Sequence, residues 1–180
     1  MGRVMHERLF SSHVFSVEQR IYTREGYDPV RRDVVVHPGA VVMLPIVDAH
    51  AIIMIRNYRY TVEQELWELP AGTREEGETP IETARRELEE ETGYRAGQMD
   101  PLMEFYTSPG ICTERMYAFV ARDLTEVGQN LQGDEQIVAE RVPIEDVRRR
   151  LLNGEFQDGK TIAVLGRYFL GLQQEPSQPS

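Results

Sequence analysis

One segment in the middle of the chain, residues 72–94, constrains the fold more than any other. It reads GTREEGETPIETARRELEEETGY, and its second half carries the start and stop signals of a helix. Thr79 is the N-cap, and Pro80 takes the first helical position. Glu82 completes a capping box, and Gly93 is the stop. Helical spacing then gathers one apolar stripe, made of Ile81, Ala84 and Leu88. The segment therefore predicts a helix with one buried face.

Three carboxylates fall side by side on this predicted helix, namely Glu87, Glu90 and Glu91. Like charges at this spacing cost roughly 0.2–0.5 kcal/mol per pair, and the helix dipole disfavours negative charge near its C-terminus. A counter-cation would remove this cost, and an all-oxygen ligand set favours Mg²⁺ or Mn²⁺. The alternative is a solvated acidic face that Arg85 and Arg86 neutralise in part.

The full spacing of the segment resembles the Nudix box. That pattern is Gly, five residues, Glu, seven residues, and then Arg-Glu-aliphatic-any-Glu-Glu-any-Gly-aliphatic. The matching residues are Gly72, Glu78, Arg86, Glu87, Leu88, Glu90, Glu91 and Gly93. Tyr94 replaces the usual final aliphatic residue, which is a packing position. A match at eight specified positions is a specific signal.

Length and composition indicate one globular domain with a modest extension. The chain has 180 residues, of which 41% are hydrophobic and 28% are charged. Its net charge of −10 argues against binding to nucleic acid or to an anionic membrane, because both need a basic surface. Cys112 is the single cysteine, so no intrachain disulfide can form. The N-terminus lacks a signal-peptide pattern, and we expect a cytoplasmic protein.

Strand and helix patterns place a small all-β segment in front of a mixed α/β domain. We expect residues 1–38 to form the β segment, residues 39–172 to form the domain, and residues 173–180 to be a disordered tail. Strands are expected at 13–23, 33–37, 41–47, 51–56, 66–70, 102–106, 116–122 and 138–142. Further helices are expected at 143–153 and 160–172.

The Nudix resemblance implies both a fold and a reaction. The fold is an α/β/α sandwich around a mixed sheet, here preceded by the antiparallel β segment. The reaction is metal-dependent hydrolysis of a diphosphate that links a nucleoside to a second group, with a water made more acidic by the metal. By the same resemblance, Glu87, Glu90, Glu91 and the backbone carbonyl of Ala71 would be metal ligands. Arg86 would orient the glutamates, and Glu87 and Glu91 would be central to catalysis.

The resemblance also predicts a catalytic base or a further metal ligand in a loop after the core strands. Glu135 is the first choice for this residue and Asp134 is the second. Some relatives carry another acidic residue at the place of Gly133, so the two-carboxylate arrangement does not transfer intact. The alternative is that both are ordinary loop residues.

Outside the box, the chain resembles the ADP-ribose pyrophosphatase branch of the family. Pro109 stands where members of that branch typically have a proline, and Gly110 follows it; the pair could equally form a simple turn. Three further segments also resemble this branch, namely 56–59, 68–72 and 158–161. We therefore expect hydrolysis of ADP-ribose to AMP and ribose 5-phosphate, and list Pro109 and Gly110 as substrate-binding residues.

Two arginines are candidates for binding the diphosphate. Arg59 matches a phosphate-contacting arginine of the branch, and Arg56 lies close to it on the same predicted strand. A guanidinium group can bind two phosphate oxygens at once. A surface position on a strand end is the alternative for Arg56. Lys160 is the one lysine beside nineteen arginines, a bias that we attribute to genome composition and not to function.

The assembly and the substrate leave several alternatives open. In relatives of this branch the front strands exchange between two subunits, so the resemblance implies a homodimer. GDP-mannose or another nucleoside-diphosphate sugar is the nearest alternative substrate. A sensor that binds ADP-ribose without cutting it is the alternative from another class. Such regulators usually lose box glutamates or carry a basic recognition helix, and this chain does neither.

Overall fold

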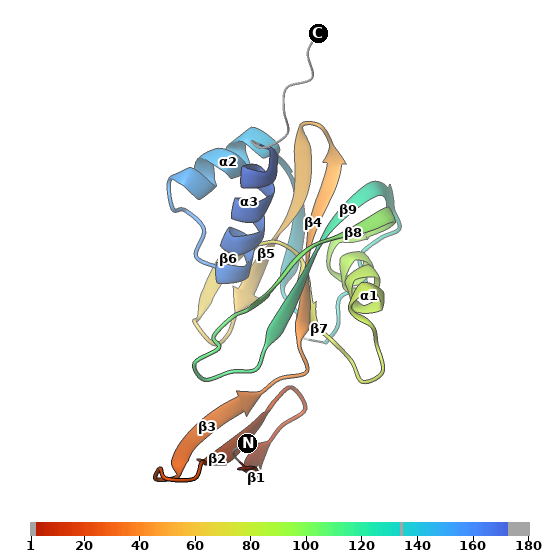
Figure 1. The fold of residues 1–180 in the computed structure, drawn as a ribbon. Coiled ribbons are helices and arrows are strands. Elements are labelled where there is room, and N and C mark those ends of the chain that lie inside the picture. The colour runs from red at the N-terminus through yellow and green to blue at the C-terminus, as the bar shows by residue number, and fades with distance from the viewer. Residues whose placement is uncertain (1–2, 134, 173–180) are drawn as a thin grey trace.

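The computed structural model of the protein describes residues 3–133 and 135–172. It contains a seven-stranded mixed sheet covered by helices and a separate three-stranded antiparallel sheet (Figure 1). The fold class predicted from the sequence, α/β with a mixed sheet behind a small N-terminal antiparallel β segment, is confirmed. The predicted disordered tail, residues 173–180, lies outside the described residues.

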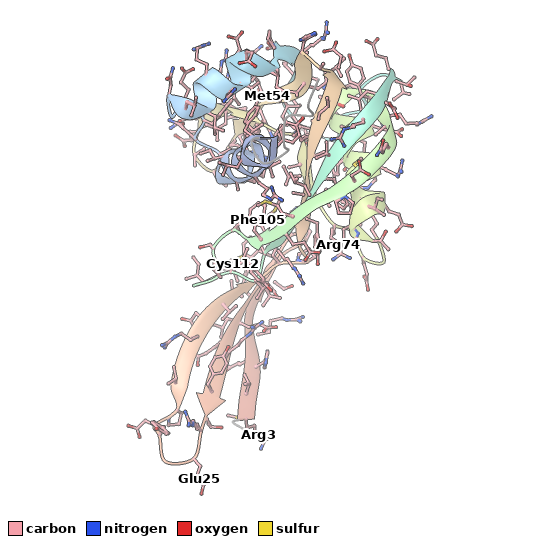
Figure 2. All side chains as sticks on the ribbon, turned by 45° about the horizontal axis from the view of Figure 1, so that its top comes forward. Arg3, Glu25, Met54, Arg74, Phe105 and Cys112 are labelled. Atoms are coloured by element: carbon pink, nitrogen blue, oxygen red, sulfur yellow. The ribbon has the colours of Figure 1, made fainter. Side chains whose placement is uncertain are left out.

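The N-terminal sheet projects away from the rest of the molecule. Its strands, in the order β1-β2-β3, are β1 (Arg3–Ser11), β2 (Ser16–Thr23) and β3 (Val30–Val36). Backbone bonds of Val35 to the loop around Cys112 join this sheet to the domain. Figure 2 shows Cys112 at this junction and Glu25 at the far end. Strand β1 was not predicted as a strand, and all of its residues are exposed, so the alternation of burial that identifies a strand is missing.

The larger sheet is built around two buried strands. Its members are β4 (Ala40–Asp48), β5 (Ala51–Arg59), β6 (Gln64–Glu68), β7 (Ala71–Thr73), β8 (Tyr94–Tyr106), β9 (Arg115–Glu126) and β10 (Ile137–Pro143). The main path runs β10-β5-β4-β9-β8, with β4 and β9 parallel and the other neighbours antiparallel. The continuous apolar runs of β4 and β5 reflect burial on both faces, as predicted.

The two central strands separate part of the way along their length. β4 and β5 pair at Ile46 with Ile52 and at Asp48 with Ala51, next to their connecting turn. Farther on, β6 pairs with β5 and β7 pairs with β4, so the chain between them crosses the opening. The N–H of Met43 donates a 2.9 Å bond to the carbonyl of Pro70 and fixes this crossing. The end of β5 and the start of β7 consequently border the same opening.

Helices cover both faces of the sheet. α1 (Pro80–Thr92) packs on one face over a core that includes Val41, Met43 and Phe119. α2 (Ile144–Leu152) and α3 (Gly159–Leu172) cover the other face, over Val42 and Leu44 (Figure 1). Within the described residues, no helix is long and apolar enough to cross a membrane.

The helix predicted from the central segment is confirmed as α1, together with its start and stop. Glu82 Oε2 accepts bonds from the N–H and the hydroxyl of Thr79, at 2.8 and 2.6 Å. Gly93 has a φ of 74°, in the left-handed region, and its N–H donates a 2.9 Å bond to the carbonyl of Glu89. Strand β8 begins directly afterwards at Tyr94, eight residues before the predicted start at 102.

Candidate active site

Helix α1 carries two of its glutamates on the face that it buries. Glu87 is 9% exposed and Glu91 is 3% exposed, and both flank the fully buried Leu88. Glu90 lies beside them and is partly exposed. The alternative of a solvated acidic face therefore does not describe Glu87 and Glu91. Two carboxylates in such a position need a compensating charge.

Strand β7 passes so close to the carboxyl group of Glu87 that a side chain at position 72 would displace this group. A Cβ atom on Gly72 would lie 1.9 Å from the carboxyl carbon of Glu87. Next to it, the N–H of Ala71 donates a 2.8 Å bond to Glu91 Oε2. The glycine at the start of the box thus has a steric basis. The contact of Ala71 runs through its N–H, and a role for its carbonyl as a metal ligand stays a prediction.

Arg86 ties the acidic residues to one another. Its Nε and Nη2 donate to the two carboxylate oxygens of Glu78, at 2.8 and 3.0 Å. Its Nη1 donates to Glu87 at 2.8 Å and to Glu90 at 3.2 Å. This pairing lowers the pKa of Glu78 to about 2. The structure therefore gives Arg86 the contacts that an orienting residue needs.

The buried carboxylates resist ionisation. Burial raises the pKa of Glu87 to about 7, although the charge of Arg86 opposes the shift. Burial also raises the pKa of Glu91 well above its usual range, against the bond from the Ala71 N–H. The negative charge of Glu135 raises the pKa of both groups further. Each of these effects disfavours the fully charged cluster unless a cation joins it.

The donor set fits a hard divalent cation. Glu87, Glu90 and Glu91 offer oxygen atoms alone, which Mg²⁺ and Mn²⁺ prefer. Arg86 Nη1 already bridges Glu87 and Glu90, so a positive group occupies the place between these two carboxylates. As the side chains stand, no three His, Cys, Asp or Glu groups of the described residues converge closely enough to hold an ion. The three carboxylates repel one another, so their side chains would have to turn toward the ion for it to bind.

The loop after β9 is fastened to the C-terminal end of α1. The side chain of Gln129 donates to the carbonyl of Glu91, and the N–H of Asn130 donates a 3.1 Å bond to the carbonyl of Glu90. These bonds satisfy carbonyls that a helix leaves unpaired at its C-terminus. The sequence analysis did not identify these two anchors, because polar residues in a loop carry no distinguishing pattern.

The same loop brings Glu135 to the acidic cluster. Gln132 donates through its side chain to Glu90 at 2.8 Å, and through its N–H to Glu135 at 2.9 Å. Glu135 lines the same hollow as Glu87 and Glu91. Asp134, the second choice for the base, lies outside the described residues.

The two candidate arginines of β5 have different surroundings. Arg59 lines the hollow of the acidic cluster and holds Glu68 through two bonds of 2.7 and 2.6 Å. Arg56 is bound by Glu140 at 2.6 Å and by Glu65 at 3.1 Å. Its guanidinium lies 5.9 Å from the ring centre of Trp67. The structure brings Arg59, and not Arg56, to the acidic cluster.

Pro109 and Gly110 border a different hollow. It has a volume of about 340 Å³ and lies between their loop and the N-terminal sheet, which contributes Arg20, Tyr22 and Arg32. None of the box glutamates lines it. The structure therefore places these two predicted substrate-binding residues apart from the acidic cluster.

Two adjoining hollows make up the cleft around the cluster. The larger has a volume of about 980 Å³ and contains Glu87, Glu91 and Glu135. The smaller has a volume of about 620 Å³ and contains Phe105 and Lys160. They share the lining residues Arg59, Thr61, Ala71, Gly72 and Thr73. The combined space can hold a ligand with two halves joined at Arg59 and Gly72.

The raised pKa of Glu87 predicts a pH-dependent stability in the absence of metal. The folded state binds this proton more tightly than the unfolded state between about pH 4.5 and pH 7, so stability should fall as the pH rises through this window. The shift corresponds to at most about 3 kcal/mol. Urea denaturation in EDTA at pH 5, 6, 7 and 8 measures it. Glu87→Gln should weaken the dependence and leave the part that Glu91 contributes, whereas the exposed Glu25→Gln should leave it unchanged. Parallel curves for Glu87→Gln and the wild type would contradict the assignment.

Several known proteins are similar to this chain in sequence. The chain is 37% identical over 160 residues to an ADP-ribose pyrophosphatase of Bacillus subtilis (88% of this chain, 86% of the relative). It is 34% identical over 170 residues to a methanol dehydrogenase activator of Bacillus methanolicus (93% and 91%). It is 28% identical over 176 residues to a GDP-mannose pyrophosphatase of an Enterobacter species (90% and 92%).

A solved structure and a family model agree with these relatives. The crystal structure of an ADP compounds hydrolase superposes with a TM-score of 0.77 at 27% identity, over 97% of this chain and 96% of that one. The model of the NUDIX domain matches residues 36–165, a range that contains the box, Glu135 and the lining of the cleft apart from His13 and Val14. The protein belongs to the Nudix family.

Proposed function

We propose that the protein hydrolyses the diphosphate of ADP-ribose to AMP and ribose 5-phosphate. The observation that carries this proposal is the pair of buried carboxylates, Glu87 and Glu91. The carboxyl group of Glu87 lies against Gly72 of β7, where a Cβ atom would overlap it. Arg59 borders the same hollow and supplies a cation for phosphate oxygens. Relatives named ADP-ribose pyrophosphatase and ADP compounds hydrolase support this substrate.

In the proposed reaction, Glu87, Glu90 and Glu91 hold Mg²⁺, or Mn²⁺ in its place. The cation, when bound, neutralises phosphate oxygens and makes a bound water more acidic. Arg86 bonds Glu87 and Glu90 and so fixes the orientation of their carboxylates. Arg59 holds the diphosphate, and Glu135 takes the proton from the attacking water. The leaving group is a phosphate, which needs charge stabilisation more than a proton.

GDP-mannose is the second candidate substrate. Relatives named GDP-mannose pyrophosphatase share 28–29% identity with the chain over nine-tenths of its length. The chemistry proposed for Glu87, Glu91 and Arg59 involves the diphosphate, which both compounds contain. A sensor without catalysis is a weaker candidate, because a binding protein does not need two buried ionisable carboxylates.

The proposed active form is a homodimer located in the cytoplasm. The N-terminal sheet exposes a series of large apolar side chains: Val4, Met5, Leu9, Phe10, Val14, Phe15, Tyr22, Tyr27 and Val30. A three-stranded sheet of this kind is more stable when another surface covers it. His13 and Val14 from its first turn also line the larger hollow of the cleft. A partner subunit that fixed the position of this sheet would therefore also fix the positions of His13 and Val14 at the cleft.

Product analysis tests the proposed reaction. Incubation with Mg²⁺ and ADP-ribose should give AMP and ribose 5-phosphate, faster than GDP-mannose is cut. Glu91→Gln should lower turnover by roughly 10²–10³-fold, because the site loses a charge that supports the transition state. Chromatography of the products measures both effects. Faster cleavage of GDP-mannose would replace the substrate and keep the reaction class. Binding of ADP-ribose without any cleavage would favour the sensor.

The role of Glu135 predicts a separate kinetic result. Glu135→Gln should lower kcat by about 10²–10⁴-fold and change KM little, because a base acts in the transition state. Glu145→Gln, an exposed change of the same kind on α2, serves as the control. Near-normal turnover in Glu135→Gln would exclude it as the base.

The proposed dimer predicts the mass of the protein in solution and a variant that halves this mass. Light scattering after size-exclusion chromatography should give twice the chain mass of 20.7 kDa. Replacing Leu9 and Phe10 together by Asp should produce monomers, because two charges then replace exposed apolar side chains that the partner would cover. An unchanged mass in this variant would show that the sheet is not the interface. A monomeric wild type would exclude the dimer itself.

A further inference from the structure

A third buried carboxylate lies next to the cleft and has no part in the mechanism above. Glu68, the last residue of β6, is fully buried. Its Oε1 accepts a 2.7 Å bond from Arg59 Nε, and its Oε2 accepts a 2.6 Å bond from Arg59 Nη2. The same Oε2 also accepts a 2.6 Å bond from Lys160 Nζ. One carboxylate is thus shared between two cations.

Lys160 is fixed in place by the start of α3. Its Nζ also donates a 2.8 Å bond to Asp158 Oδ1. The other oxygen of Asp158 accepts bonds from the N–H and the hydroxyl of Thr161, at 3.0 and 2.6 Å, and so caps the helix. The hydroxyl of Thr161 in turn accepts a 2.8 Å bond from the N–H of Leu69. The helix cap and the residue after Glu68 are therefore one bonded unit.

This arrangement affects how Arg59 can bind a phosphate. A buried carboxylate with a single cationic partner would hold that partner strongly, since water does not compete for it. Lys160 supplies a second cation to Glu68 and also bonds Asp158, so the group pairs two cations with two carboxylates, and Arg59 shares Glu68 with Lys160. The two bonds to Glu68 use Nε and Nη2 of Arg59, which leaves the Nη1 edge of the guanidinium outside that pair. A guanidinium in this state keeps both its orientation and its capacity to bind an anion.

We infer that Lys160 is a positioning residue for the diphosphate: through Glu68 it orients Arg59 and keeps the positive charge of that arginine available to the substrate. This inference rests on the proposed function, because it assigns a role within the same cleft. It gives the single lysine of the chain a specific role, which composition alone does not predict. Lys160 lines the smaller hollow, and Arg59 lies at the boundary between the two hollows.

Kinetics of Lys160→Met test the inference. KM for ADP-ribose should rise by about tenfold, the effect of weakening one charge-assisted bond. The value of kcat should change by less than about threefold, because Arg59 holds the phosphate in the ground state and the transition state alike. Lys160→Arg should restore most of the affinity. Arg122→Gln, which removes a surface pair with Asp100, is the control for a lost ion pair. An unchanged KM in Lys160→Met would overturn the inference.

A double variant separates positioning from direct contact. In a Glu68→Gln background, Lys160→Met should change KM by less than about twofold, because the residue through which Lys160 acts is gone. A full tenfold effect in that background would mean that Lys160 touches the substrate itself, and would overturn the positioning role. Where Glu68→Gln fails to fold, an Arg59→Gln background gives the same comparison, because Lys160→Met should change KM little once the arginine that it positions is gone.

A binding measurement keeps this inference distinct from the proposed reaction. Calorimetric titration with ADP in EDTA measures the affinity of the cleft for a diphosphate without metal or turnover. Lys160→Met should bind ADP about tenfold more weakly than the wild type, whereas Arg122→Gln should bind it equally. This result supports the inference even where the wild type cuts no ADP-ribose. Equal affinity of Lys160→Met and the wild type overturns it even where the proposed reaction is correct.

Discussion

The close contact between Gly72 and the carboxylate of Glu87 is the constraint on which the rest of the site depends. A Cβ at position 72 would overlap the carboxyl group at 1.9 Å, so the carboxylate of Glu87 can keep this position only with glycine there. The same approach allows the N–H of Ala71 to bond Glu91. Burial of both carboxylates follows, and with it the raised pKa values that make a cation the natural partner of the cluster.

The divergence of β4 and β5 provides the space for this contact. Because β6 and β7 occupy the opening, the residues just before and after the crossing at Leu69 belong to one short segment. Its first end carries Glu68, which holds Arg59, and its other end carries Ala71 and Gly72, which contact the acidic helix. A single stretch of chain thus sets the distance between the arginine and the carboxylates. The bond from the Leu69 N–H to Thr161 fixes that stretch to α3.

The predictions from sequence are accurate where the information is local. The helix, its caps and the burial of Ala84 and Leu88 follow from spacing within fifteen residues, whereas Ile81, the first residue of the predicted stripe, is 38% exposed. The contact of Arg86 with Glu90 follows from the same helical geometry. The pairing of Arg59 with Glu68 and Lys160 depends instead on strand pairing and on a helix that begins ninety residues later. Spacing could not separate Arg56 from Arg59 either, because the side chain of Arg56 lies with Trp67 and Glu140.

An acidic protein that binds a diphosphate must place its positive charges locally. The net charge of −10 repels an anion at long range, yet salt screens charges beyond about 8 Å at physiological ionic strength. The groups inside the cleft therefore decide whether the anion binds. Glu68 adds no positive charge to the cleft, but it fixes the positions of two cations, Arg59 and Lys160. A buried anion can thus serve the binding of another anion by orienting the cation that contacts it.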